Sequence, residues 1–197
     1  QGLRMEQTQE RLLNAAAELF SKQGYAGVSM RDIARAVGIT QAAIYHHFPN
    51  KDALYIATVT HLFEQHTLGI SKKMSTIDDP AQRLEVLIGA MLEATEKDPR
   101  FRRIYMRELL EGDEKKLAAI AENAFTAFYE PLYALMGELA PDSDPQLLIF
   151  SMAGMIFHHL EVRKLAPHLP HAAEGSTGIP LLTSHITQLF LHGVNPA

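Results

Sequence analysis

SMRDIARAVGITQAAIYHHFPNK, residues 29–51, contains two short helical patterns separated by a break at Gly38. In the first pattern, apolar side chains recur at the spacing of one helix face, at Met30, Ile33, Ala34 and Val37. Ser29 and Asp32 have the spacing of a capping box, which predicts that this helix begins directly after Ser29. Gly38 is expected to end it, because glycine adopts the left-handed conformation of a helix end without a Cβ clash.

The second pattern begins at Thr40, a residue type that is typical of helix N-caps. Its core-facing positions are expected at Ala43, Ile44 and Phe48. Two short helices joined by a tight turn predict a helix-turn-helix, the motif that places its second helix in the DNA major groove. The candidate DNA contacts are the side chains that packing does not need: Ser29, Arg31, Thr40, Gln41, Ala42, Tyr45, His46, His47 and Lys51.

These residue types suit duplex DNA. Glutamine pairs with adenine through two hydrogen bonds and alanine contacts the thymine methyl group. Gln41 and Ala42 are therefore predicted to read bases, with ordinary surface residues as the alternative. Tyrosine and threonine hydroxyls donate to phosphates, which predicts backbone contacts for Tyr45 and Thr40.

Four further positions keep an alternative. Arg31 either reaches a base edge or phosphate or is a solvated arginine. Ser29 is first of all a cap, although a cap beside a phosphate can also bind it. Of His46 and His47, one is expected at the DNA backbone, while the other packs beside the predicted core.

Lys51 follows Pro49 and Asn50 at the predicted first turn of a further helix. A cation at this position opposes the positive end of the helix dipole. A phosphate held jointly by the lysine and the free amides of the turn would remove the conflict. Lys51 is therefore predicted to bind the DNA backbone.

Residues 8–63 resemble the DNA-binding domain of the tetracycline-repressor (TetR) family of one-component bacterial regulators. The resemblance rests on LFSKQGYAGVSM, RDIARAVGIT and, above all, AIYHHFPNKDALY. It implies an all-α protein, with an N-terminal three-helix helix-turn-helix domain and a C-terminal helical bundle for ligand binding and dimerisation. It also implies a repressor that a small effector releases from its operator.

Composition excludes several other classes. The chain has no cysteine, which excludes disulfides, thiolate metal sites and a cysteine nucleophile. No apolar run approaches the ~20 residues of a membrane span and the N-terminus is polar, so a soluble cytoplasmic protein is expected. The net charge of −5 is unusual for a DNA-binding protein. Residues 29–51 nevertheless hold three basic residues against one acid, which predicts binding through a few well-placed contacts in a dimer.

The expected domains are a helix-turn-helix domain at 1–50, a connecting helix at 51–69 and a ligand-binding and dimerisation domain at 70–197. A first helix is predicted at 8–23, and the connecting helix is expected to start at Lys51 and end near Gly69. Beyond it, helices are predicted at 81–96, 99–110, 114–139, 145–165 and 179–193. Gly112 is expected to separate the helices at 99–110 and 114–139, and Pro131 is expected to kink the second of these.

The last two predicted helices, 145–165 and 179–193, are apolar over more than one face. Helices of this kind are buried on two sides, which predicts one face toward the domain core and one toward a second subunit. A two-fold dimer places its recognition helices about 34–36 Å apart, so the operator is expected to be a near-palindrome.

Methionines and aromatic residues of the C-terminal part are candidates for an adaptable apolar pocket, with core packing as the alternative. His158 lies in an otherwise apolar stretch, where an imidazole could fix a polar ligand group or be satisfied in the core or the dimer interface. The candidate pocket residues are Met91, Tyr105, Phe125, Phe128, Tyr129, Met152, Met155 and His158.

The sequence lacks the common motifs of catalytic sites and of di-iron sites. The sequence has no GxSxG elbow, P-loop or dinucleotide fingerprint. It also lacks the Glu-x-x-His pairs of di-iron bundles, and offers only the reverse order at His61/Glu64 and His158/Glu161. We therefore expect a regulator with no metal, no cofactor and no catalytic residues. The alternatives are a helical-bundle enzyme or carrier with a vestigial helix-turn-helix, an activator, or a regulator that answers a partner protein.

Overall fold

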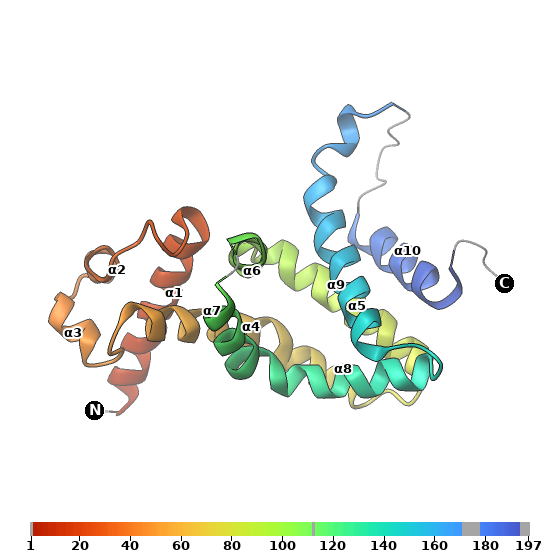
Figure 1. Cartoon of the computed structure of the whole chain (residues 1–197), viewed down its shortest axis with the longest axis horizontal. Coiled ribbons are helices and arrows are strands. Elements are labelled where there is room, and N and C mark those ends of the chain that lie inside the picture. Colours follow the sequence, from red (N-terminus) through yellow and green to blue (C-terminus); the bar gives the residue numbers. More distant parts are fainter. Residues whose placement is uncertain (1, 112, 171–177, 194–197) are drawn as a thin grey trace. The chain divides into compact units, whose positions relative to one another are not determined.

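The computed structural model describes residues 2–111, 113–170 and 178–193, and every regular element in these ranges is a helix (Figure 1). The all-α fold class predicted from the sequence is confirmed. The chain forms two compact units, and each takes residues from two separate parts of the sequence. The first unit comprises residues 1–65 and 99–126, and the second comprises 66–98 and 127–197.

The first unit contains the helix-turn-helix and the helices that support it. Its elements are α1 (Gly2–Gln23), α2 (Met30–Val37), α3 (Gln41–Tyr45), the first part of α4 (Lys51–Met74), α6 (Arg100–Glu111), α7 (Glu114–Ile120) and the π turn η1 (Ala121–Phe125). Helix α1 packs against α2 and α6. The core of the unit is made of side chains at most 2% exposed, including Leu12, Phe20, Ile33, Ile44, Leu54, Tyr55 and Leu62.

The second unit is a helical bundle in which α5 packs against both α9 and α10. Its elements are the end of α4, α5 (Pro80–Lys97), α8 (Thr126–Leu139), α9 (Pro145–Val162), the 3-10 turn η2 (Ala166–His168) and α10 (Ile179–His192). An ion pair of 2.6 Å between Arg163 and Glu96 joins α9 to α5. No described helix combines the length and apolar character that crossing a membrane requires.

The predicted helices are present, and α1 and α4 are longer than expected by several residues. Helix α1 begins at Gly2 and not at residue 8. Helix α4 continues past Gly69 to Met74, because Ile70 and Met74 are buried and extend its apolar face. The predicted end near Gly69 was therefore wrong.

The stretch predicted as one helix at 114–139 is divided into α7, η1 and α8. The helix geometry changes at the π turn η1, before Pro131, which lies inside α8. At this turn the Thr126 hydroxyl donates to the carbonyls of Ala121 and Glu122, both at 3.2 Å. The predicted break at Gly112 lies outside the described residues.

The two compact units are defined by the packing of the chain. The predicted domains at 1–50, 51–69 and 70–197 are defined by function, and this division stays a prediction. Packing adds one feature that the division did not contain: residues 99–126 belong with the N-terminal helices. Helix α4 is a single continuous helix that runs from the first unit into the second.

Replacing a glycine by alanine is expected to have opposite effects on the free energy of unfolding at Gly38 and at Gly69. Gly38 has a φ of +76°, where an L side chain is strained, and Gly69 lies within α4 with open space around its Cα. Gly38→Ala is expected to lower the free energy of unfolding by about 1–2 kcal/mol, and Gly69→Ala to raise it by about 0.5–1 kcal/mol. Urea unfolding measures both, and shifts of the same sign in the two variants would contradict the assigned conformations.

The His159 imidazole on α9 lies 5.6 Å, between ring centroids, from that of His185 on α10. Burial lowers the pKa of His159 below its ordinary 6.5, and the nearby His185 and His158 lower it further. The unfolded chain therefore binds a proton at this position more readily, so stability present above pH 6.5 is lost as the pH falls below it. We expect the urea midpoint of the wild type to fall more steeply from pH 7 to 5.5 than that of His159→Gln. Equal slopes would contradict this expectation.

Candidate nucleic-acid interface

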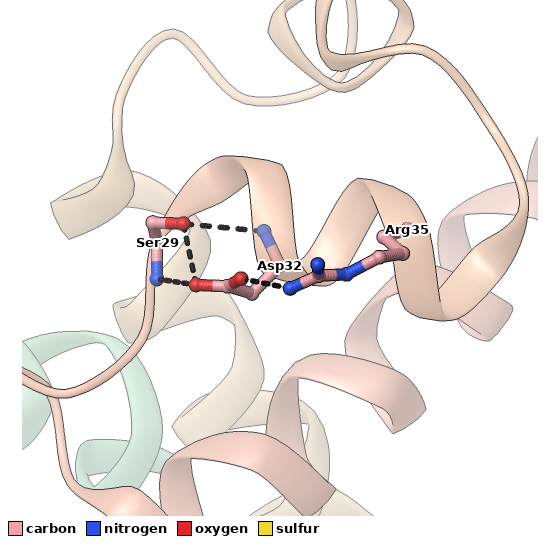
Figure 2. A network of polar contacts seen from close by, with 3 residues as sticks. All are labelled: Ser29, Asp32 and Arg35. Carbon is pink, nitrogen blue, oxygen red and sulfur yellow. Dashed lines mark hydrogen bonds and ion pairs between the residues drawn. The ribbon is translucent and has the colours of Figure 1, made fainter.

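The start of α2 is fixed by a reciprocal pair of hydrogen bonds (Figure 2). The Asp32 N–H donates to Ser29 Oγ at 3.2 Å, and the Ser29 N–H donates to Asp32 Oδ2 at 3.0 Å. The predicted capping box is thus confirmed. The hydrogen bonds from Ser29 lower the pKa of Asp32, and an ion pair of 2.5 Å with Arg35 acts in the same direction. This acid of the motif is therefore neutralised locally by Arg35.

The turn between α2 and α3 has the geometry that its sequence predicts. Gly38 caps α2 in the left-handed conformation, with φ 76° and ψ 34°. Arg11 of α1 donates to the carbonyl of Val37 at 3.0 Å and so ties the end of α2 to the supporting helix. Thr40 Oγ1 accepts the N–H of Ala43 at 3.2 Å, which confirms it as the N-cap of α3.

Helix α3 is shorter than expected, because it ends at Tyr45. Phe48 still reaches the core, with 5% of its side chain exposed. The ring centroid of His47 lies 6.5 Å from that of Phe48, whereas His46 is exposed. His47 therefore lies beside Phe48 and His46 faces solvent, while the expected contact of one histidine with the DNA backbone stays a prediction.

Seven of the nine candidate DNA contacts are exposed, and the other two are half-buried. The exposed residues are Ser29, Arg31, Thr40, Gln41, Ala42, Tyr45 and His46, and the half-buried ones are His47 and Lys51. A shallow, open hollow brings four of them together, since its lining includes Ser29, Gln41, Tyr45 and Lys51. The Tyr45 side chain is 47% exposed although it is aromatic, so packing does not explain its presence.

Lys51 is the first residue of α4, and Asn50 caps this helix by accepting the N–H of Ala53 at 2.8 Å. The Lys51 ammonium lies 4.1 Å from the ring centroid of Tyr25, as in a cation–π contact. The Tyr25 hydroxyl donates to Asp52 at 2.5 Å. Within the part of the chain that the structure describes, no carboxylate forms an ion pair with Lys51. The ammonium is therefore positioned by an aromatic ring and keeps its capacity to bind an anion.

A second lysine approaches the same ring. The Lys116 ammonium of α7 lies 3.9 Å from the Tyr25 ring centroid. Partial burial lowers the pKa of Lys51, and the charge of Lys116 lowers it further, while Asp52 acts in the opposite direction. Burial and the hydrogen bond to Asp52 raise the pKa of Tyr25 to about 12.

Sequence reasoning missed the arrangement of Tyr25 and Lys116 around Lys51. It also missed the buried hydrogen bond of 2.6 Å from the Tyr55 hydroxyl to Glu108, which joins α4 to α6 in the same unit. The only signal was the resemblance itself, whose segments contain both tyrosines; nothing in the sequence pairs Lys116 with residues so far from it.

The candidate pocket residues are distributed over both units. In the first unit, Tyr105 and Phe125 have ring centroids 6.2 Å apart and belong to an aromatic cluster with Phe63 and Phe101. Burial raises the pKa of Tyr105. In the second unit, Phe128 and Met152 are buried, Met91, Tyr129 and Met155 are half-buried, and His158 is exposed. Their role as a pocket stays a prediction.

Residues 12–58 match the family described as bacterial regulatory proteins, tetR family. The matched segment is a TetR-family DNA-binding domain. The chain is 25% identical to the transcriptional regulator RutR of Escherichia coli K12, across 94% of this chain and 89% of that protein. It is 29% identical to the transcriptional activator FasR of Mycolicibacterium smegmatis, across 64% of this chain and 57% of that protein.

The fold of the whole chain is also similar to solved structures. FadR of Bacillus subtilis, a transcriptional regulator solved in complex with stearoyl-CoA, superposes with a TM-score of 0.78 at 16% identity, over 94% of this chain and 99% of that one. The chain is accordingly a DNA-binding transcriptional regulator with an N-terminal helix-turn-helix. The alternative of a helical-bundle enzyme or carrier finds no support among these relatives, which are transcriptional regulators.

Proposed function

We propose that this TetR-family chain is a homodimeric repressor that binds a near-palindromic operator through α3. Gln41 and Ala42 read bases in the major groove, and Tyr45, Thr40 and Lys51 hold the flanking phosphates. The observation that carries the proposal is the hollow in which Ser29, Gln41, Tyr45 and Lys51 meet. Arg31 and His46 are exposed, which leaves both of them accessible to the DNA backbone.

The proposed dimer forms through α9 and α10. Exposed residues of α9 recur along one helix face, at Leu147, Phe150, Ser151, Gly154 and His158. Leu147 and Phe150 are 62% and 56% exposed, and small residues follow them, which suits close approach of another helix. Leu181 of α10, 52% exposed, adds to the apolar surface of the second unit. His158 lies on this face, which favours its interface alternative over a pocket role.

The proposed effector is a small, largely apolar molecule. Stearoyl-CoA in the FadR structure is a ligand with a long apolar chain, and it supports an apolar effector for a chain of the same fold. The aromatic residues Phe101, Tyr105 and Phe125 supply an apolar surface beside α4 in the first unit. The effector must prefer the arrangement that cannot bind DNA, and a coupling of about 1–3 kcal/mol would change operator affinity about 5–150-fold. Because α4 begins at Lys51, a tilt of this helix would change the spacing of the two recognition helices.

Selection of bound sequences from random duplex DNA tests the proposed function. The expected product is an inverted repeat whose half-sites lie about one helical turn apart. Enrichment of a single unrepeated half-site, or of no sequence at all, would contradict a two-fold operator complex. Addition of extracts of apolar metabolites to the selected complex then identifies the effector by loss of the shifted band.

A further inference from the structure

A groove on the first unit lies between α1 and the first four turns of α4. Its apolar part is formed by Leu13 of α1 with Ala53 and Ala57 of α4, and its polar part by Thr60, His61 and Glu64 of α4. Ala53 and Ala57 are four residues apart and so lie on one face of the helix, where their small side chains leave room. The groove is separate from the hollow that holds Tyr45 and Lys51.

Two buried polar atoms of this groove have no hydrogen-bond partner among the described residues: the Thr60 hydroxyl and Nε2 of His61. Buried polar atoms are almost always paired, because an unpaired one loses its hydration without compensation. Thr60 and His61 are successive residues that both line this groove, so a side-chain rotation that turns the two buried atoms toward it lets a bound group hydrogen-bond to them.

The charge of the groove selects the kind of group. Glu64 is exposed and is the one formally charged side chain among the described lining residues. A hydroxyl oxygen and a neutral imidazole nitrogen accept hydrogen bonds, as does a carboxylate. A ligand that donates several hydrogen bonds and carries a positive charge satisfies all three, whereas an anion would be repelled by Glu64.

The π turn η1 contributes Asn123 to the lining of the groove. The Asn123 side-chain N–H donates to the carbonyl of Ala119 at 2.7 Å, which holds the side chain in place. π turns inside α-helices are frequent at functional sites, and this one departs from α geometry where it meets the groove.

We propose that this groove is a binding site for a small organic cation, a primary amine with an apolar body. The ammonium donates to Thr60 Oγ1 and His61 Nε2 and pairs with Glu64, while the body lies over Ala53 and Ala57. The site lies entirely within the first unit, and binding there requires neither operator nor dimer. It therefore goes beyond the proposed function, and it can fail without affecting that function.

Titration of the full chain with three probes of equal size tests the charge preference. Benzylamine, benzyl alcohol and benzoate are added separately while binding is followed by calorimetry and by NMR. Benzylamine is expected to bind, benzyl alcohol to bind more weakly and benzoate not to bind. Absence of benzylamine binding, or binding of benzoate that is as tight, would overturn the proposal.

Variants locate the binding to this groove. Thr60→Val keeps the shape of the side chain but removes its hydroxyl, and is expected to weaken the binding of benzylamine roughly 2- to 10-fold. The same change removes an unpaired buried oxygen, so it should raise the Tm of the ligand-free protein by a few degrees, on the order of 2–4 °C. A lower Tm together with unchanged benzylamine binding would show that the hydroxyl does not belong to such a site.

Glu64→Gln has a matched control in Glu10→Gln, because Glu10 is exposed on α1 but does not line the groove. Glu64→Gln is expected to weaken the binding of benzylamine roughly 2- to 5-fold and to leave the binding of benzyl alcohol unchanged. Glu10→Gln should change the affinity for neither probe. Ala57→Leu fills the groove and should abolish binding of both probes. Equal effects of the two glutamate changes, or full binding in a folded Ala57→Leu variant, would contradict the assignment.

Discussion

Lys51→Met is expected to weaken operator binding by about 3 kcal/mol, or roughly 100-fold, because each of two subunits loses a charge-assisted hydrogen bond to phosphate. The methionine keeps much of the apolar stem that lies near Tyr25, so the fold should be retained. The slope of log K against log salt should become shallower by about 2, one for each lost phosphate contact. Fluorescence anisotropy over a salt series measures both quantities.

Combining the lysine change with Tyr45→Ala is expected to abolish binding. Tyr45 is 47% exposed, so its truncation should leave the unfolding midpoint almost unchanged. Lys22→Met is the matched control, since Lys22 is an exposed lysine of α1 paired with Glu18 and is no candidate contact. Loss of affinity in Lys22→Met equal to that in Lys51→Met would show that only general charge matters.

Phe150→Glu is expected to dissociate the proposed dimer and, with it, the operator complex. An aromatic anchor at an interface contributes about 2–4 kcal/mol, and the two-fold axis doubles the loss. A charge on the same surface adds repulsion between the two copies. Sedimentation equilibrium should show monomers at concentrations where the wild type is dimeric.

Leu110→Glu is the control for this variant, because Leu110 is 83% exposed on α6 and lies outside the proposed interface. It introduces the same charge and should leave the dimer intact. Monomers from Leu110→Glu and dimers from Phe150→Glu would place the interface elsewhere.

The helix-turn-helix could be predicted from the sequence because its determinants are local. The side chains of Ser29 and Thr40 accept backbone N–H groups three residues ahead, and Gly38 adopts the left-handed conformation at a helix end. The structure confirms all three caps. The end of α3 was less predictable, since Phe48 is buried whether or not the helix reaches it. Apolar spacing identifies a buried side chain but does not determine the backbone that carries it there.

Contacts between distant segments could not be predicted in this way. The approach of Lys116 to Tyr25, and the joining of residues 99–126 to the N-terminal helices, depend on how helices pack. The same limit applies to the pocket residues, because Tyr105 and Phe125 have the spacing of core residues whether or not a ligand touches them. The groove at Thr60 and His61 gave no sequence signal, since it consists of small residues and of polar atoms left unpaired by their surroundings.

The most direct test of the central claim is the structure of the full chain bound to its selected operator. We expect α3 in the major groove, with Gln41 at base edges, and Tyr45 and Lys51 at phosphates on each half-site. A complex in which α3 faces away from the duplex, or in which Lys51 has no phosphate within hydrogen-bonding distance, would contradict the account.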